Sequence, residues 1–133
     1  MNSTRQQVIC YLAHMKLCAA QDFTILPRAK NSDFLFGFGI SFEVARDVVL
    51  QMKPADYVEG PVRDDKDLLR DDVWVFGKTL SWEDGSVDAY IKLMVKDDPS
   101  GRRCVCVSFH EAEFPLRYVF GGEQREAYLL PEM

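Results

Sequence analysis

Tyrosine, lysine and histidine side chains recur at two-residue spacing in the second half of the chain. Tyr90 and Lys92 stand two positions apart in one candidate strand, and Ser108 and His110 do so in the next. Successive side chains of a strand point to opposite faces, so each pair shares a face. Apolar residues fill the alternate positions of the first strand, as in a strand with one face in the core. Such polar groups on an open face indicate chemistry on an anion.

Two turn clusters predict how these strands pair. A turn centred near Pro99 would close a hairpin that places Tyr90 opposite Ser108. A second turn near Asp84 would place Lys78 of the preceding strand opposite Tyr90. Cross-strand diagonals are about 7–8 Å long, which long side chains can span, whereas a one-residue slip would invert a face. The predicted constellation is Lys78, Tyr90, Lys92, Ser108 and His110.

Alternation also assigns the remaining residues of these strands. It places Cys104 and Cys106 on the face of Ser108 and His110, and it turns residues 105, 107 and 109 to the core. A zinc site on that face would need a second ligand pair at the usual spacing, so we predict no metal and no cofactor. In the preceding strand Trp74 and Phe76 share the face of Lys78. A segment covering that face would either shape a cleft or bury the site.

Length and composition predict a single soluble domain over residues 1–133. The chain has 133 residues, a formal charge of −5 and no apolar run near the roughly 20 residues of a membrane span. No signal-peptide pattern opens it, and the four cysteines are scattered, so we expect a cytoplasmic protein. The acidic balance argues against DNA binding by this chain alone and leaves room for a local cationic pocket. The acidic loop at residues 64–72 is either a solvated loop or a partner site.

The elements that would carry the site have an α+β order. Apolar spacing predicts a helix over residues 5–20, and Ser41 can cap a second helix that runs to about Met52. Residues 21–39 look irregular, because Pro27 forbids a simple helix there. Three strands follow, with a short fourth near residues 116–120. We therefore predict two N-terminal helices and an antiparallel sheet of three to four strands.

Several sequence runs resemble the MqsR-type toxins of bacterial type II toxin–antitoxin systems. The resemblance spans residues 40–120 and rests on the runs KPADY at 53–57, EGP at 59–61, VWVFGK at 73–78, YIKL at 90–93, SFH at 108–110 and FPLR at 114–117. It implies a RelE-like fold, endoribonuclease activity on messenger RNA without a metal, and a cognate antitoxin protein as partner. Tyr90 and Lys92 match the family's central strand, and His110 falls where better-known members have a lysine.

That activity gives each candidate residue a role. The ribose 2′-hydroxyl would attack the adjacent phosphorus, and the products would be a 2′,3′-cyclic phosphate and a 5′-hydroxyl. His110 would be the general acid, with general base as the alternative, because histidine exchanges protons near neutral pH. Tyr90 would orient the hydroxyl or stack on a base. The predicted phosphate and RNA contacts are Lys78, Lys92, Ser108, Arg117, Arg28 and Lys30.

A non-catalytic alternative stays open at the sequence level. Glu59 and Val75 stand where better-known members of the family have a lysine and a glutamine. These differences favour a RelE-like binding or regulatory module as the second hypothesis. A toxin-like fold that only binds a partner through its acidic loop is the third.

Overall fold

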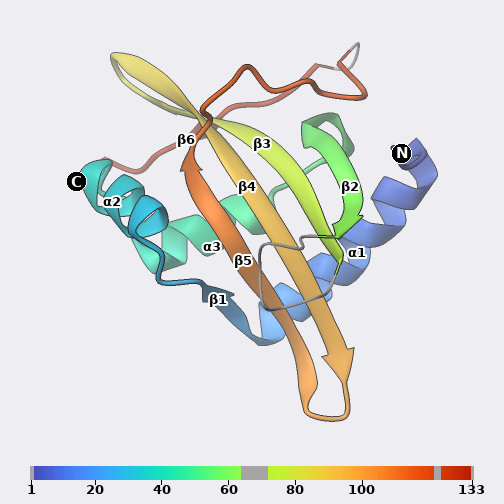
Figure 1. The fold of residues 1–133 in the computed structure, drawn as a ribbon. Coiled ribbons are helices and arrows are strands. Elements are labelled where there is room, and N and C mark those ends of the chain that lie inside the picture. Colours follow the sequence, from blue (N-terminus) through green and yellow to red (C-terminus); the bar gives the residue numbers. More distant parts are fainter. Residues whose placement is uncertain (1, 64–71, 122–123, 133) are drawn as a thin grey trace.

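The computed structural model describes residues 2–63, 72–121 and 124–132, and Figure 1 shows its ribbon. Most of the acidic loop predicted as a possible partner site lies outside these residues. Within them the helices and strands follow in the order α1 (Arg5–Gln21), β1 (Phe23–Ile25), α2 (Ala29–Gly37), α3 (Phe42–Leu50), the 3-10 helix η1 (Pro54–Asp56), β2 (Tyr57–Arg63), β3 (Asp72–Trp82), β4 (Gly85–Asp98), β5 (Gly101–Glu111) and β6 (Tyr128–Leu129).

The strands form one mixed sheet with the order β1-β5-β4-β3-β2, and β6 pairs with β3 beyond this path. The neighbours from β5 to β2 are antiparallel, whereas β1 lies parallel to β5 and β6 lies parallel to β3. The α+β class is therefore confirmed. The prediction of a purely antiparallel sheet with three to four strands is wrong, because β1 joins the β5 edge in parallel, β2 forms the other edge, and β6 pairs in parallel with β3.

Both predicted helices are present and begin at capping residues. The Thr4 side chain accepts from the Gln7 backbone N–H at 3.2 Å, and the Gln7 side chain accepts from the Thr4 N–H at 2.8 Å. This reciprocal pair is a capping box at the start of α1. The Ser41 hydroxyl accepts from the Val44 N–H at 3.1 Å and caps α3.

The segment predicted to be irregular instead contains β1 and helix α2. Pro27 does not interrupt α2, because the helix begins two residues later, after the N-cap Arg28. β1 forms because Phe23 pairs with Cys104 in the neighbouring strand and buries its ring in the core. The prediction of a fourth strand at residues 116–120 is wrong. These residues do not form a strand of the sheet, and their side chains pack over Gly77 instead.

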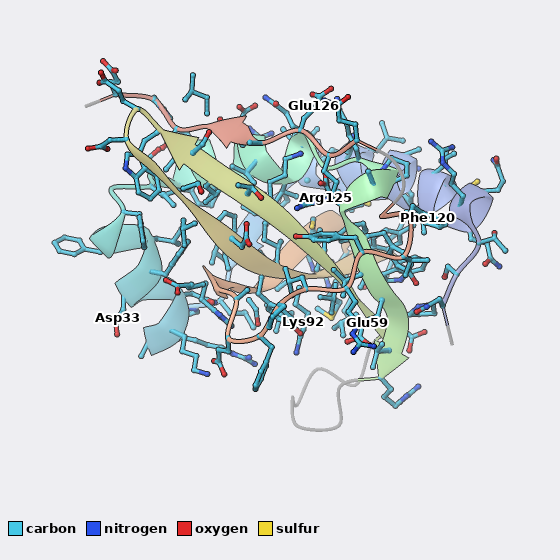
Figure 2. The ribbon with its side chains drawn as sticks, turned by 90° about the horizontal axis from the view of Figure 1, so that it is seen from above. Asp33, Glu59, Lys92, Phe120, Arg125 and Glu126 are labelled. Carbon is cyan, nitrogen blue, oxygen red and sulfur yellow. The ribbon has the colours of Figure 1, made fainter. Side chains whose placement is uncertain are left out.

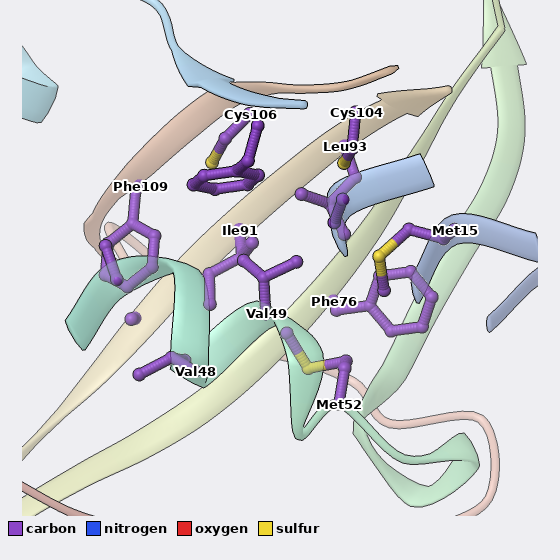
Figure 3. Close-up of a cluster of buried hydrophobic side chains, with 14 of the residues drawn as sticks. Met15, Val48, Val49, Met52, Phe76, Ile91, Leu93, Cys104, Cys106 and Phe109 are labelled. Carbon is purple, nitrogen blue, oxygen red and sulfur yellow. The ribbon is translucent and has the colours of Figure 1, made fainter. Parts of the chain in front are cut away.

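The hydrophobic core lies between the sheet and helices α1 and α3 (Figure 1). We call this side of the sheet the inner face and the opposite side the outer face. Figure 3 shows Cys104 and Cys106 in the core beside Ile91 and Leu93, which contradicts the predicted outward orientation of both cysteines. The other core residues labelled there are Met15, Val48, Val49, Met52, Phe76 and Phe109.

None of the helices in the described ranges has the length and apolar character that a bilayer crossing requires.

Candidate functional site

A β-bulge in β5 determines which of its side chains reach the outer face. Cys106 pairs with Leu93 and Ser108 pairs with Lys92, so Val107 is an extra residue between two paired positions. The extra residue reverses the alternation along the strand. As a result Cys106 points into the core, while Ser108 lies beside Lys92 on the outer face.

The bulge also compensates for an error in the predicted hairpin. The hairpin pairs Asp98 with Gly101, so each residue of β4 lies opposite the residue of β5 that is one position later than predicted. Without the bulge, this shift would place an inward-facing residue of β5 opposite Tyr90. The extra residue moves the register once more, so that Tyr90 lies opposite His110 rather than opposite Ser108. The predicted partners are wrong, but the predicted face of these side chains is confirmed.

These four side chains form two neighbouring rows that line a cavity of about 300 Å³. One row pairs Tyr90 with His110, and the next pairs Lys92 with Ser108. Figure 2, which views the molecule from above, shows Lys92 on the side of the sheet away from α1 and α3. The segment after β5 supplies the remaining lining residues, Glu113, Phe114 and Leu116.

The aromatic row has the geometry of a stacked pair. The rings of Tyr90 and His110 are nearly parallel, with centroids 5.4 Å apart and an interplanar angle of 18°. The Lys92 Nζ lies 6.0 Å from the Tyr90 ring centroid, at the outer limit of a cation–π contact. The site therefore places a cation beside two flat rings.

A backbone carbonyl determines which nitrogen of His110 can exchange protons. The His110 Nδ1 lies 2.9 Å from the carbonyl oxygen of Glu111. A carbonyl oxygen only accepts hydrogen bonds, so Nδ1 must carry the proton. In the neutral ring Nε2 is then an acceptor, and in the imidazolium form it is a donor. The same atom can serve as general base or general acid.

Asn31 supports the bulge and was not identified from the sequence. Its side chain is buried, accepts from the Phe109 N–H at 2.8 Å, and donates to the carbonyls of Val107 and Leu26 at 3.1 and 3.0 Å. Asparagine has low helix propensity, yet it lies within α2. That conflict is the one sequence signal that could have marked this position.

Glu113 at the rim of the cavity is held by a lysine from α2. The Lys30 ammonium donates to the Glu113 carboxylate, and both side chains are exposed. This hydrogen bond, together with the charges of Lys30 and His110, lowers the pKa of Glu113. The predicted RNA contact Lys30 thus acts on the cavity through a carboxylate that the sequence analysis did not select.

Lys78 lies away from this group of side chains. It pairs with Ala89 rather than Tyr90, because β3 is shifted by one residue from the predicted register and no bulge compensates. The shift turns Lys78 to the inner face, where its ammonium bonds the Asp56 carboxylate at 3.0 Å and only 3% of its side chain is exposed. The predicted register of Lys78 is therefore wrong. The sequence left open whether its face would form a cleft or be buried, and the structure shows that Lys78 is buried.

The other predicted RNA contacts lie outside the cavity lining. Arg28 is exposed at the N-cap of α2, and Arg117 is exposed between two residues that pack toward the outer face. Glu59 is exposed in β2, where it pairs with the buried Val75. The structure therefore brings together four of the eight predicted site residues as cavity-lining groups.

The described residues contain no cluster of three or more His, Cys, Asp or Glu side chains arranged to hold a metal ion. Burial raises the pKa of the Cys104 thiol to about 12, and it raises the pKa of Cys106 as well. Metal binding and nucleophilic attack both need the thiolate. These cysteines consequently act as core residues.

No protein-family model matches the chain, and neither a curated protein nor a solved structure does so. The assignment of a function therefore rests on the geometry of the cavity and on the chemistry of its lining.

Proposed function

We propose that the protein is a metal-independent endoribonuclease that cleaves messenger RNA through attack by the ribose 2′-hydroxyl. One observation carries the proposal. The stacked Tyr90–His110 row and the Lys92–Ser108 row line the same cavity of about 300 Å³. A cavity of this size lies at the small end of ligand sites and suits one nucleotide. The lining combines a proton-transfer group, a cation, a hydroxyl and aromatic rings.

The reaction needs one proton to leave and another to arrive. The 2′-oxygen forms a bond to phosphorus as its proton passes to a base, and the bond from phosphorus to the 5′-oxygen breaks. The departing 5′-oxygen takes a proton from an acid. The products are a 2′,3′-cyclic phosphate and a 5′-hydroxyl, and no electrons are exchanged with a cofactor.

His110 is suited to donate the second proton. Its Nδ1 is committed to the Glu111 carbonyl, so Nε2 is the nitrogen that transfers the proton. The imidazolium form acts as general acid on the leaving 5′-oxygen, which is the role we assign. The neutral form would act as general base on the 2′-hydroxyl, and the dependence of cleavage rate on pH separates the two roles.

Lys92 and Ser108 are suited to hold the scissile phosphate. A lysine ammonium offers a charge and three donors, and the serine hydroxyl adds one more donor. Donors placed where charge develops typically contribute about 10²–10³-fold each to the rate. Tyr90, in the neighbouring row, would orient the ribose hydroxyl or stack on a base.

The resemblance to MqsR-type toxins supports this proposal and extends it. It adds a RelE-like classification of the fold, a cytoplasmic toxin, and a cognate antitoxin that would neutralise the chain.

A non-catalytic binding or regulatory module is the second candidate. It is favoured by the inward orientation of Lys78, which removes one predicted cation from the outer face. It is favoured too by the exposed carboxylate Glu113 at the rim, which opposes the approach of a polyanion. Such a module would bind a partner at this cavity without cutting RNA.

The deciding experiment uses the purified chain and a mixed-sequence RNA in EDTA, with RNA ends mapped by primer extension. We expect discrete cuts with cyclic phosphate ends from the parent and none from His110→Ala. The matched control is His14→Ala, which removes the other histidine, an exposed residue of α1 paired with Asp97. A cleaving His110→Ala variant would refute the assigned role. Intact RNA with the parent, also in the presence of translating ribosomes, would support the binding module.

A further inference from the structure

The proposed cleavage needs a group that takes the proton of the ribose 2′-hydroxyl. His110 carries a proton on both ring nitrogens when it acts as general acid, so it cannot accept another proton in the same step. Three further polar groups line the cavity, but tyrosine, lysine and serine side chains ordinarily keep their protons at neutral pH. These three are Tyr90, Lys92 and Ser108.

Glu113 is the lining residue that can accept this proton. Its carboxylate lines the same cavity as His110 and Lys92, and 53% of its side chain is exposed, so a substrate can reach it. An ionised carboxylate accepts hydrogen bonds and can act as a general base. The remaining lining residues, Phe114 and Leu116, are apolar. Among the described residues that line the cavity, Glu113 supplies the only carboxylate.

Two contacts hold Glu113 beside the cavity. The backbone N–H of Ala112 donates to the carbonyl of Asp88 at 2.9 Å, which fixes the chain directly after β5 ends at Glu111. The Lys30 ammonium of α2 donates to the Glu113 carboxylate. A catalytic group that is already in position before the substrate binds lowers the entropic part of the barrier. The fold therefore presents this carboxylate to the cavity at a set place.

The charges around Glu113 favour its ionised form. The hydrogen bond and charge of Lys30, and then the charge of His110, lower the pKa of the Glu113 carboxyl group. The carboxylate therefore persists in the pH range where a histidine can still be protonated. The other titratable groups that line this cavity, or the adjoining one that Glu113 also borders, are Tyr90, Lys92, Asp88 and Glu111.

We propose that Glu113 is the general base of the cleavage reaction and that Lys30 is its positioning residue, an inference that rests on the proposed ribonuclease function. The Glu113 carboxylate takes the proton of the 2′-hydroxyl while the 2′-oxygen bonds to phosphorus. The bond from phosphorus to the 5′-oxygen breaks as that oxygen takes the proton from Nε2 of His110. The step leaves Glu113 as a neutral carboxylic acid and His110 as a neutral ring, and proton exchange with water restores both.

Cleavage kinetics of purified Glu113→Gln test this role, because the amide keeps the size of the side chain but cannot take a proton. We expect kcat to fall by about 10²–10⁴-fold, the usual contribution of general acid–base catalysis, while KM changes by less than about threefold. The matched control is Glu83→Gln, at an exposed carboxylate in the turn after β3, which should cleave like the parent. Titration calorimetry with the uncleavable 2′-deoxy form of the RNA should give parent-like affinity for Glu113→Gln. A loss of affinity as large as the loss of cleavage would assign Glu113 to binding and contradict the proposal.

The pH dependence of kcat separates a base from a residue that only shapes the cavity. The parent should give a bell-shaped profile, because the rate rises as Glu113 loses its proton and falls as His110 loses its own. Glu113→Gln should lack the rise on the acidic side. Lys30→Met removes the hydrogen bond and the charge that lower the pKa of Glu113, so its rise should move to higher pH. An acidic rise at the same pH in all three proteins would refute the role of Glu113.

A substrate with sulfur in place of the leaving 5′-oxygen distinguishes the base from the acid. A thiolate leaves without being protonated, so cleavage of this RNA needs the base but not the acid. We expect His110→Ala to cleave it within about tenfold of the parent, and Glu113→Gln to remain slower by about 10²-fold or more. Rescue of Glu113→Gln, or no rescue of His110→Ala, would overturn the assignment.

The parent protein separates failure of this inference from failure of the proposed function. Cleavage of ordinary RNA at equal rates by the parent and by Glu113→Gln would remove Glu113 from the reaction and leave the ribonuclease intact. RNA that the parent leaves uncut would overturn both proposals.

Discussion

The side-chain carbonyl of Asn31 accepts a 2.8 Å hydrogen bond from the backbone N–H of Phe109, 78 positions further along the chain. The same amide donates to the Val107 carbonyl at 3.1 Å. Pairing between β1 and β5 reaches only Cys106, so Asn31 continues the edge of the sheet where β1 has ended. It satisfies two backbone groups around the bulge and thereby holds Ser108, the residue between them, against the cavity.

Replacement of Asn31 by alanine should damage both the fold and the site. We expect Asn31→Ala to lower the free energy of unfolding by about 2–4 kcal/mol, because two buried backbone groups lose their partners. Urea denaturation would measure this loss, and the control is Ser32→Ala at the exposed next position. RNA cleavage should also fall at a temperature where the variant is still folded. A change below about 0.5 kcal/mol would show that water replaces the amide.

Lys78 should behave as a structural residue. Lys78→Ala leaves Asp56 buried without its main ionic partner, which typically costs about 3–5 kcal/mol in the free energy of unfolding. The double variant Lys78→Met with Asp56→Asn removes both charges and should recover most of that loss. Lys92→Met, on the outer face, should change stability by less than about 1 kcal/mol yet reduce cleavage.

The same series can contradict this assignment. If Lys78→Ala unfolds at the same urea concentration as the parent but no longer cleaves RNA, then Lys78 belongs to the site despite its orientation. If it is unstable and the double variant regains both stability and cleavage, then the pair serves the fold.

Local sequence signals predict the elements that depend on local interactions. Helix α1 follows from its apolar spacing, and α3 follows from its capping residue Ser41. β1 and α2 are missed because they depend on pairing with β5 and on contacts of Asn31, which are distant in the sequence. The same is true of β6, whose two residues pair with β3.

The sequence assigned the β5 residues of the cavity to the correct face only because two register errors cancelled. A turn displaced by one residue would have inverted the face of β5, and the bulge at Val107 inverted it again. The shift of β3 met no such compensation, so Lys78 points inward. A bulge stabilised by Asn31 leaves no periodic signal in β5 itself, because its cause lies in another element.

The segment after β5 approaches the sheet closely at Gly77. A Cβ atom added there would clash with Leu116 Cδ1 and with the Tyr118 hydroxyl. The Tyr118 ring cannot move freely, since the Arg125 guanidinium lies 3.6 Å from its centroid. We expect Gly77→Ala to cost about 1–3 kcal/mol through overpacking and to weaken nucleotide binding, because Leu116 lines the cavity.

A matched glycine variant serves as the control for that experiment. A Cβ atom at Gly37 meets nothing within 4 Å, so Gly37→Ala should leave both the unfolding midpoint and nucleotide binding unchanged or slightly improved. Nucleotide binding by Gly77→Ala that equals that of the parent would show that residues 112–120 do not determine the shape of the cavity wall.

Tyr128 ties β6 to α3 and should make stability depend on alkaline pH. Its hydroxyl donates to Asp47 Oδ2 at 2.5 Å, and partial burial together with this carboxylate raises the pKa of Tyr128 to about 12. In the unfolded chain a tyrosine has a pKa of about 10. Between pH 10 and 12 the folded protein keeps this proton and the unfolded chain releases it. The contribution of Tyr128 is therefore complete below pH 10 and declines as the pH rises toward 12.

Comparison with Tyr128→Phe isolates this contribution from other groups that titrate in the same range. At pH 7 the parent should be more stable than the variant by about 1–2 kcal/mol, the usual contribution of a hydrogen bond to a charged acceptor at a partly exposed site. When urea unfolding is repeated, that difference should be unchanged at pH 9 and should shrink at pH 10 and further at pH 11. A difference that is equal at pH 7 and pH 11 would mean that the phenol of Tyr128 ionises at the same pH in the folded and unfolded chains, so the bond to Asp47 would not exist in solution.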